Sequence, residues 1–471
     1  SRYAILSSNV NYLKYTSWEG FPARQDLYVL DLETGERSKV AEEVRARASI
    51  SPGGNYLLWY SSTDSAWFSY SIAERKQVRL TSNTPYPFFD EEDDHPDFPS
   101  PYGSAGWLKD DKAVWIYDRY DIWQFDPTSK TAPINMTKNG RVTKNVYRYV
   151  DVDNENEFID PDGPVYLLGF NEITKGNGYF SYNLRKKDYK SLIWNDDKRV
   201  SNLAKAQNSK ELVFTIANFN IFPDLHYTAN EFKSAIAISN ANPQQADYKW
   251  GSVDLVEWTA LDGQQLEGML FKPEGFDPSK KYPMMVYFYE KNSDNLNRHV
   301  APAPHRSIIN FTFYTSRGYL VFVPDIPYQI GYPGPSAVNA VLSGVTSMMA
   351  KGFVDKDRIG VQGHSWGGYQ SAFLITRTDI FRAAEAGAPV SNMFSAYGGI
   401  RWGSGLSRMF QYEHTQSRIG GTIWEYPLRY MENSPIFFAD KINTPLLIMH
   451  NDNDGAVPWY QGIELFVALR R

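Results

Sequence analysis

A serine between two glycines is the residue of this chain best suited to nucleophilic chemistry. Residues 363–367 read GHSWG, a G-x-S-x-G pattern with Ser365 at its centre. A serine hydroxyl is a weak nucleophile at neutral pH, so it needs a base to take its proton and an acid to orient that base. A catalytic Ser365 therefore requires two further side chains elsewhere in the sequence.

The residues around Ser365 favour a nucleophile over a structural serine in a tight turn. The segment RIGVQG at 358–363 has the character of a strand, and YQSAFLITR at 369–377 has that of an apolar helix. A nucleophile elbow needs this strand-turn-helix setting. The flanking glycines relieve crowding in the sharp turn, and the start of the helix favours developing negative charge.

An acid follows a later apolar strand. Asp454 lies in the loop after residues 445–449, in the segment LLIMHNDNDGAVPW, and Asp452 is its rival. An acid at the end of a strand can position a catalytic base, but it can equally be a turn or solvated residue. Spacing alone therefore does not decide between Asp454 and Asp452, and either acid could simply be a turn or solvated residue.

The base is harder to find. In α/β-hydrolases the catalytic residues follow the chain order serine, acid, histidine, yet the residues after Asp454, GAVPWYQGIELFVALRR, include no histidine. We expect His364 to project away from Ser365 and His450 to end a buried strand. The chain has 7 histidines, and all precede Asp454: His95, His226, His299, His305, His364, His414 and His450.

The second half of the chain predicts an α/β domain over residues 251–471. Continuous apolar runs at 282–289, 319–323 and 445–449 are typical of parallel strands that are covered on both faces. Stretches of helical character alternate with these runs at 336–351, 366–377 and 459–470. Such alternation is the pattern of an α/β fold.

The first half, residues 1–250, predicts a β-propeller of about four blades. A polar turn followed by an aromatic strand recurs as SPGGNYLLWY at 51–60, LKDDKAVWIY at 108–117 and AQNSKELVFT at 206–215, with a degraded copy, FIDPDGPVYLL, at 158–168. Regular repeats of short strands are typical of propeller blades. A twisted β-sandwich is the alternative, but it does not need an internal period.

Composition excludes several classes of function. With 471 residues, two domains are expected, and 48 basic against 54 acidic residues give a formal charge of −6, which argues against nucleic-acid binding. The absence of cysteine excludes disulfides and thiolate metal sites. The longest apolar runs are too short to span a membrane. Composition leaves the compartment open.

The chain resembles the prolyl oligopeptidase family of serine peptidases, nearest its dipeptidyl-peptidase and acylaminoacyl-peptidase branches. The segments that carry the resemblance are DRIGVQGHSWGGYQ at 357–370, AGAPVSNM at 386–393 and HNDNDGAVP at 450–458. The resemblance implies a propeller followed by an α/β-hydrolase domain. It also implies a peptide substrate with no cofactor and no metal ion, and it leaves open whether the chain forms a homo-oligomer.

The resemblance implies a role for seven residues. Ser365 matches the nucleophile and Asp454 the acid, in preference to Asp452. The Trp366 backbone N–H and the Tyr289 hydroxyl match the donors that stabilise the oxyanion. The pocket for the residue before the scissile bond is matched by Trp366, Tyr369, Val390 and Val457.

The family places its histidine in a loop beyond a helix like that at 459–471. The resemblance therefore implies that the histidine lies beyond residue 471 and that the chain is a fragment, incomplete at both ends. By analogy with bacterial relatives we expect a periplasmic or secreted location. Glu290, Lys291 and Asn292 replace the usual glycine-rich turn, and Ala456 replaces an asparagine. Proline selectivity is therefore not implied.

Two alternatives to a peptidase are kept. An esterase or acyl hydrolase could use the same site, because fold and triad do not fix the leaving group. A binding protein whose hydrolase domain has lost its base is the other alternative. The acidic run DEEDDHPDFP at 90–99 is interpreted as a solvated loop rather than a group that binds the free N-terminus of a substrate.

Overall fold

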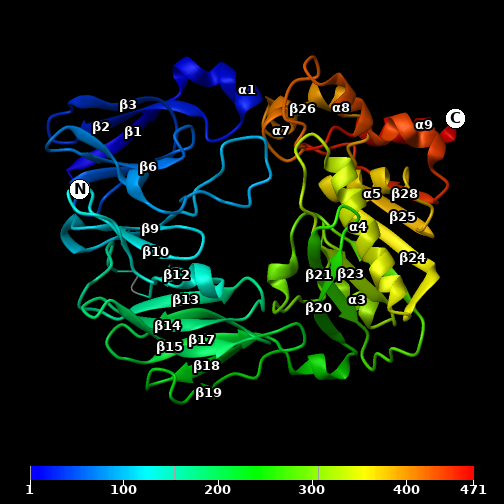
Figure 1. Ribbon diagram of the computed structural model, residues 1–471, viewed down its shortest axis with the longest axis horizontal. Coiled ribbons are helices and arrows are strands. Elements are labelled where there is room, and N and C mark those ends of the chain that lie inside the picture. Colours follow the sequence, from blue (N-terminus) through cyan, green and yellow to red (C-terminus); the bar gives the residue numbers. More distant parts are fainter. Residues whose placement is uncertain (1, 153–154, 306) are drawn as a thin grey trace.

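A computed structural model describes residues 2–152, 155–305 and 307–471 and divides the chain into two domains that lie side by side (Figure 1). The predicted boundary at residue 250 falls in the segment between β19 (Ile236–Ala237) and β20 (Ser252–Thr259). None of the helices in the described residues combines the length and the apolar character that are needed to cross a membrane.

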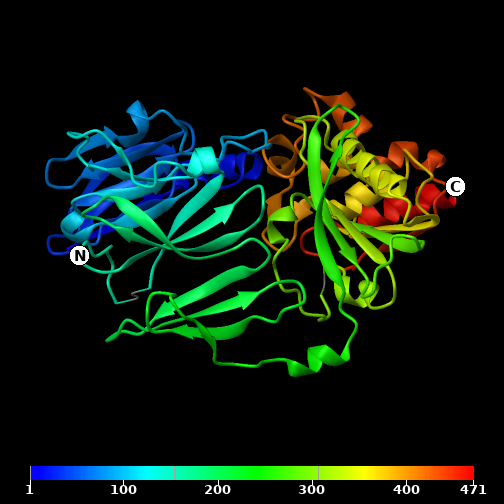
Figure 2. The same cartoon turned by 60° about the horizontal axis from the view of Figure 1, so that its bottom comes forward.

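The first domain consists of five antiparallel sheets that follow one another along the chain and form an arc of stacked sheets (Figures 1 and 2). The first sheet has three strands, β1 (Tyr3–Ser8), β2 (Arg24–Asp31) and β3 (Arg37–Arg45). The other four sheets have four strands each, and the strands follow the chain order within each sheet. The second and third sheets consist of β4 (Ala48–Ile50), β5 (Tyr56–Ser61), β6 (Ala66–Ser71) and β7 (Lys76–Arg79), and of β8 (Ser104–Trp107), β9 (Val114–Tyr117), β10 (Ile122–Phe125) and β11 (Ile134–Asn135). The fourth and fifth consist of β12 (Asn145–Val150), β13 (Val165–Asn171), β14 (Asn177–Asn183) and β15 (Asp188–Asn195), and of β16 (Arg199–Lys205), β17 (Leu212–Ala217), β18 (Asp224–Thr228) and β19.

Each sequence repeat ends in the second strand of a four-stranded sheet, namely β5, β9, β13 or β17. These strands are the most deeply buried because both of their faces pack on a neighbouring sheet. In β5, for example, Leu57 packs in the cluster shared with the first sheet, whereas Leu58 packs in the cluster shared with the third. Side chains of a strand alternate between its two faces, so aromatic and aliphatic residues must occupy successive positions.

The count of about four predicted units corresponds to these four-stranded sheets. The sheet β1–β3 precedes the first repeat that the sequence pattern revealed, and its middle strand has no polar turn and aromatic run of the same kind. Residues 26–36 form most of β2 and the turn that follows it. The described residues therefore contain one more sheet than the repeats indicate.

The second domain is the predicted α/β domain, built on a seven-stranded sheet with the order β20-β21-β23-β22-β24-β25-β28. The strands β23, β22, β24, β25 and β28 pair in parallel. Strand β21 pairs antiparallel with both of its neighbours, β20 and β23. The strands not yet given are β21 (Gln265–Lys272), β22 (Tyr282–Tyr287), β23 (Leu320–Pro324), β24 (Val354–His364), β25 (Ala383–Gly387) and β28 (Leu446–Met449), with a separate hairpin of β26 (Ile400–Arg401) and β27 (Leu406–Ser407).

Helices cover both faces of this sheet. Alternate residues of β23 point to opposite sides: Phe322 packs in the cluster of α4 (Pro333–Ala350) and α5 (Trp366–Leu374), and Val321 packs in that of α3 (Phe311–Thr315). This two-sided burial explains the continuous apolar runs. The remaining helices are α1 (Thr16–Glu19), α2 (Gly140–Thr143), α6 (Met393–Tyr397), α7 (Met409–Glu413), α8 (Pro427–Glu432) and α9 (Tyr460–Arg470), with short 3-10 turns at 10–15, 80–83, 109–111, 243–247, 293–295 and 435–441.

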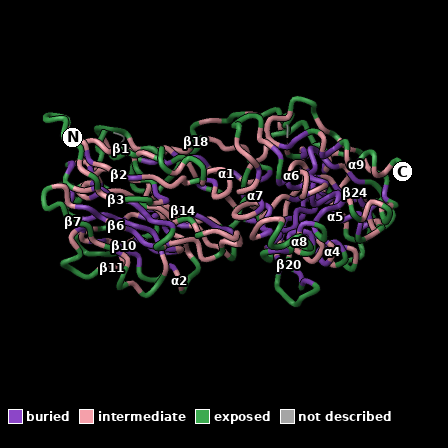
Figure 3. Tube along the Cα trace, turned by 90° about the horizontal axis from the view of Figure 1, so that it is seen from above, coloured by how far each residue is buried: buried purple, intermediate pink, exposed green. Residues whose placement is uncertain are grey.

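The two domains touch where α1 of the first domain lies against α7 of the second (Figures 1 and 3). A methyl group on Gly20, at the end of α1, would lie 3.0 Å from the Phe410 ring of α7. The Ser407 hydroxyl donates a hydrogen bond of 2.8 Å to the Ser17 carbonyl. The hairpin β26–β27 and the helix after it are therefore held from outside their own domain.

The interpretation of the acidic run as a solvated loop is wrong, because its carboxylates pair with basic side chains. Asp94 binds the buried Arg418 of the second domain at 2.7 Å, and Glu92 binds Lys291 of that domain, also at 2.7 Å. Asp97 pairs with the buried Arg45 at 2.8 Å within the first domain. The run therefore joins the two domains.

Candidate active site

Ser365 lies at a strained turn between β24 and α5. Its backbone has φ 58° and ψ −114°, a conformation that costs an L-amino acid free energy and is concentrated at functional sites. The Ser365 N–H donates to the Gly387 carbonyl at 2.7 Å, and its own carbonyl accepts from the Tyr369 N–H at 3.0 Å. The turn is thus fixed to β25 on one side and to the helix on the other.

Three glycines make this turn possible by removing side chains where backbones meet. A Cβ atom on Gly363 would lie 2.2 Å from the Gly367 carbonyl oxygen, and one on Gly368 would lie 2.3 Å from the Gly387 carbonyl oxygen. A Cβ on Gly367 would lie 2.9 Å from the Phe288 carbonyl oxygen. The G-x-S-x-G pattern is therefore required by close packing at this point, as a nucleophile elbow requires.

The structure brings most of the predicted site residues around one cavity of about 420 Å³. Five predicted residues line it: Tyr289, Ser365, Trp366, Val390 and Val457. Tyr369, which was assigned to the same pocket, does not line it, because its side chain is fully buried beneath Trp366 with the two rings stacked 4.5 Å apart. Tyr369 supports the cavity wall from behind.

The two candidate oxyanion donors belong to residues that line this cavity. Gln416 Nε2 donates a hydrogen bond of 2.8 Å to the Tyr289 hydroxyl oxygen, which leaves the hydroxyl hydrogen free to point elsewhere. The Trp366 N–H belongs to the first turn of α5, where backbone N–H groups have no partner within the helix. The Tyr328 hydroxyl accepts a hydrogen bond from the Trp366 indole at 3.1 Å and donates one to the Tyr289 carbonyl at 3.0 Å. It therefore links the two residues that carry the candidate donors.

Asp454 is held by its own loop in an orientation suited to an acceptor. One carboxylate oxygen accepts the backbone N–H groups of Ala456 at 2.8 Å and Val457 at 3.0 Å. Its side chain is mostly buried, with 21% exposed, whereas Asp452 is an exposed residue of the same loop. Of the two acids, only Asp454 has a fixed carboxylate.

Asp454 does not line the cavity of Ser365 but a second cavity, of about 220 Å³, together with His305, His364, His450 and Glu385. His450 Nε2 lies 3.8 Å from the second Asp454 oxygen and 3.2 Å from the Val457 carbonyl oxygen. Burial lowers the pKa of His450 and raises that of Glu385 to about 7. Among the described residues, which include all seven histidines, none of these rings lines the cavity of Ser365.

The sequence patterns did not indicate two arginines that line this cavity. Arg401 and Arg408, at the two ends of the hairpin segment, line the cavity with Ser365. They come from a stretch without a motif, and their approach to Ser365 depends on how the hairpin folds back. The one available signal was their charge within the otherwise weakly charged segment 392–410.

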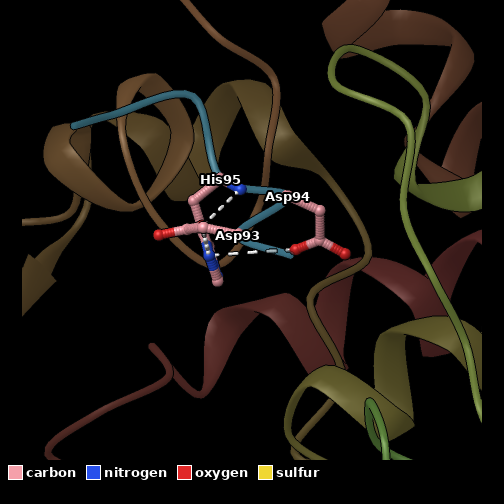
Figure 4. Close-up of side chains that lie close together, drawn as sticks. All are labelled: Asp93, Asp94 and His95. Atoms are coloured by element: carbon pink, nitrogen blue, oxygen red, sulfur yellow. Dashed lines mark hydrogen bonds and ion pairs between the residues drawn. The ribbon is translucent and has the colours of Figure 1, made fainter. Parts of the chain in front are cut away.

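The side chains of Asp93, Asp94 and His95 also converge, with one potential ligand atom of each within 4.8 Å of the others (Figure 4). Their contacts within the protein account for this arrangement. His95 Nδ1 bonds Asp93 at 2.7 Å, while Asp94 binds Arg418 and accepts the Tyr328 N–H at 2.9 Å. The cluster therefore belongs to the contact between domains.

Comparison with known proteins agrees with this geometry. Residues 304–471 match the prolyl oligopeptidase family. This match lies within the second domain, and it confirms over these residues the resemblance drawn from the sequence. The chain is 26% identical over 232 residues to the peptidase YuxL of Bacillus subtilis, which is named as uncharacterized, covering 46% of this chain and 32% of that protein. It is also 26% identical over 223 residues to an Arabidopsis thaliana protein named "Probable glutamyl endopeptidase, chloroplastic", covering 43% and 21%.

The fold extends the likeness to the whole chain. A puromycin-hydrolyzing peptidase of Mycobacterium tuberculosis aligns with a TM-score of 0.65 at 15% identity, covering 95% of this chain and 70% of that one. At this level of identity the likeness concerns the fold alone. The chain spans about a third or less of the length of the two curated relatives, at 32% and 21%.

Proposed function

We propose that this protein is a serine peptidase that hydrolyses short peptides, with Ser365 as its nucleophile. The observation that carries the proposal is the strained Ser365 turn opening into a cavity that also contains Tyr289 and Trp366. Of the two relatives, only the Arabidopsis thaliana protein is named after a residue that it acts on, and at 26% identity that name does not fix the specificity of this chain.

In this mechanism the Ser365 hydroxyl oxygen attacks the carbonyl carbon of the scissile peptide bond and its proton passes to a histidine. The resulting oxyanion receives hydrogen bonds from the Tyr289 hydroxyl and the Trp366 N–H. The histidine then gives its proton to the leaving amine, which breaks the C–N bond and leaves an acyl-enzyme. Water, deprotonated by the same histidine, releases the acid and restores Ser365.

We assign the role of base to a histidine beyond residue 471, since neither His364 nor His450 lines the cavity of Ser365. Asp454 would accept the Nδ1 proton of that histidine and stabilise the imidazolium. Its outer oxygen is available for this role because the backbone N–H groups of Ala456 and Val457 occupy the other one. The first domain, as a propeller beside the cavity, would restrict entry to short peptides.

The test is to measure hydrolysis of peptide anilides and matched esters by the full-length gene product. Ser365→Ala is expected to lower kcat by about 10⁴-fold or more, since a nucleophile cannot be replaced. Ser279→Ala, on an exposed turn, serves as the matched control and should retain activity.

Turnover of esters without peptides would support the esterase alternative. Turnover that persists in Ser365→Ala would refute the mechanism, and absence of any turnover would support a binding protein.

A further inference from the structure

Two positive charges stand in the wall of the cavity that contains Ser365. Arg408 is 3% exposed, and Arg401 is half-buried. Both arginines come from the segment 400–408, and both line the cavity that Ser365 lines. A guanidinium group keeps its charge in proteins, so burial of two of them needs an explanation.

The contacts of these arginines leave their charges largely uncompensated. Arg401 donates to the Gln411 amide oxygen at 3.1 Å, and Arg408 donates to the Ala456 carbonyl. The Arg408 Nε is buried and has no hydrogen-bond partner. Within the described residues neither arginine has a carboxylate within 4.0 Å, whereas the neighbouring Arg418 binds both Asp94 and Glu290.

The electrostatic surroundings of Arg401 are consistent with a charge that is only partly compensated. Burial lowers the pKa of Arg401, as does repulsion from Arg408, while Asp454 and Tyr289 act in the opposite direction. Asp454 therefore partly compensates the charge of Arg401 without forming an ion pair with it. A buried charge without a partner is costly, and a carboxylate supplied by a ligand would relieve that cost.

The rest of the lining is mixed, with Gln411, Gln416 and Ser417 as polar members and a set of apolar side chains. Trp366, Val390, Val457 and Phe410 are among the apolar members. Apolar side chains beside a guanidinium pair complement a short aliphatic stem that ends in a carboxylate. Arginine is also the side chain whose planar donors fit a carboxylate by paired hydrogen bonds.

We infer that this cavity binds an acidic side chain, glutamate or aspartate, in the residue whose carbonyl Ser365 attacks. Arg401 and Arg408 would pair with its carboxylate while the apolar side chains hold its stem. The inference rests on the proposed function, because it places the acyl side of the scissile bond in this cavity. A lysine there would be repelled, and a leucine or proline would leave both arginines without a partner.

The test compares peptides that differ only at the residue before the scissile bond, carrying Glu, Asp, Gln, Leu or Lys. With the full-length gene product, kcat/KM for Glu is expected to exceed that for Gln by roughly tenfold or more, because charge-assisted hydrogen bonds replace neutral ones. Arg401→Gln should reduce the Glu to Gln ratio several-fold, and Arg401→Glu should move the preference toward Lys. Arg382→Gln, an exposed arginine at the start of β25, is the control and should keep the wild-type ratio.

A carboxylate could also come from the C-terminus of the substrate. Peptides with an amidated C-terminus keep the side-chain carboxylate and remove the terminal one. Retention of the Glu preference in the amides supports the inference, and its loss overturns it. Arg408→Lys keeps the charge but loses the planar fork, so a partial preference is expected.

Binding separates this inference from the proposed function. In Ser365→Ala, product peptides ending in Glu should bind at least several-fold more tightly than those ending in Gln, whether or not the wild type cleaves them. Cleavage without any Glu preference would overturn the inference and leave the peptidase intact. Tight binding of Glu products without cleavage or labelling of Ser365 would refute the peptidase and keep the site.

Discussion

The elbow around Ser365 and the wall opposite it, residues 400–418, form the same cavity but are held in different ways. The elbow is held by close backbone approaches involving Gly363, Gly367 and Gly368. The wall is held by the first domain, through Ser407 to the Ser17 carbonyl and through Arg418 to Asp94. One side of the site is thus encoded locally, and the other depends on contacts across more than 300 residues.

This difference separates the residues proposed for the chemical step from those proposed for substrate selectivity. The proposed nucleophile and one proposed oxyanion donor, the Trp366 N–H, are fixed by a turn and a helix start, which tolerate little change. The two arginines and Gln416 line the same cavity from a segment that the first domain supports. A change in the first domain can therefore alter the wall and leave the elbow intact.

The largest effect is expected where the elbow is most crowded. Gly363→Ala and Gly368→Ala should each lower the free energy of unfolding by roughly 3 kcal/mol or more, because the added methyl group meets a backbone carbonyl oxygen, that of Gly367 or that of Gly387. Chemical denaturation measures this directly. Gly398→Ala is the matched control, since its φ is −78° and nothing lies within 4 Å of the new methyl group. Equal losses at Gly363 and Gly398 would contradict the account of the elbow.

Tyr289 connects the two sides, because it follows β22 while its hydroxyl is held by Gln416 of the wall. Tyr289→Phe should lower kcat by about 10²-fold with little change in stability, as expected for loss of one oxyanion donor. Gln416→Ala should give a smaller loss, since it only orients the hydroxyl. A Tyr289→Phe variant with wild-type kcat would exclude the hydroxyl from the reaction.

Arg418 tests the support of the wall. Arg418→Gln leaves Asp94 and Glu290 without their buried partner and should lower the free energy of unfolding by about 3 kcal/mol. The exposed pair of Arg185 and Asp162 offers a control, since Arg185→Gln should cost less than about 0.5 kcal/mol. If both substitutions cost the same, the contact between domains does not hold the wall.

The smallest effect concerns Glu385, beside the elbow. Burial raises its pKa to about 7, so the folded state retains a proton that the unfolded state loses near its ordinary pKa of 4.5. The stability that this proton contributes is present at low pH and is lost as the pH rises through about 7. Glu385→Gln should therefore stabilise the protein by roughly 1 kcal/mol at about pH 8, after allowance for solvent screening, and by little at about pH 5. Thermal unfolding at both pH values measures the difference, and an equal effect at both would contradict it.

The elbow could be predicted from sequence because its determinants lie within a few residues of Ser365. The same holds for the α/β domain, whose apolar strands and helices alternate locally, and for the four repeats that form β5, β9, β13 and β17. The sheet β1–β3 was missed because it lacks that repeat. Local reasoning worked wherever one strand or turn carried the signal.

The parts that failed depend on distant partners. The acidic run was interpreted as solvated because nothing near it in sequence shows that Asp94 meets Arg418. Arg401 and Arg408 were missed for the same reason, and Tyr369 was assigned to the pocket although the stacking of Trp366 above it buries its ring. Charge and aromatic character are visible in a sequence, but the direction in which a side chain points within a packed wall is not.

Labelling with a fluorophosphonate shows whether Ser365 is an activated nucleophile. The reagent forms a covalent bond to serine only where a base and an oxyanion site support attack. The account predicts stoichiometric modification of the full-length gene product, located at Ser365 by mass spectrometry and strongly slowed in Asp454→Asn. Absence of modification at Ser365 in the folded protein, or its persistence at an unchanged rate in Asp454→Asn, would contradict the account.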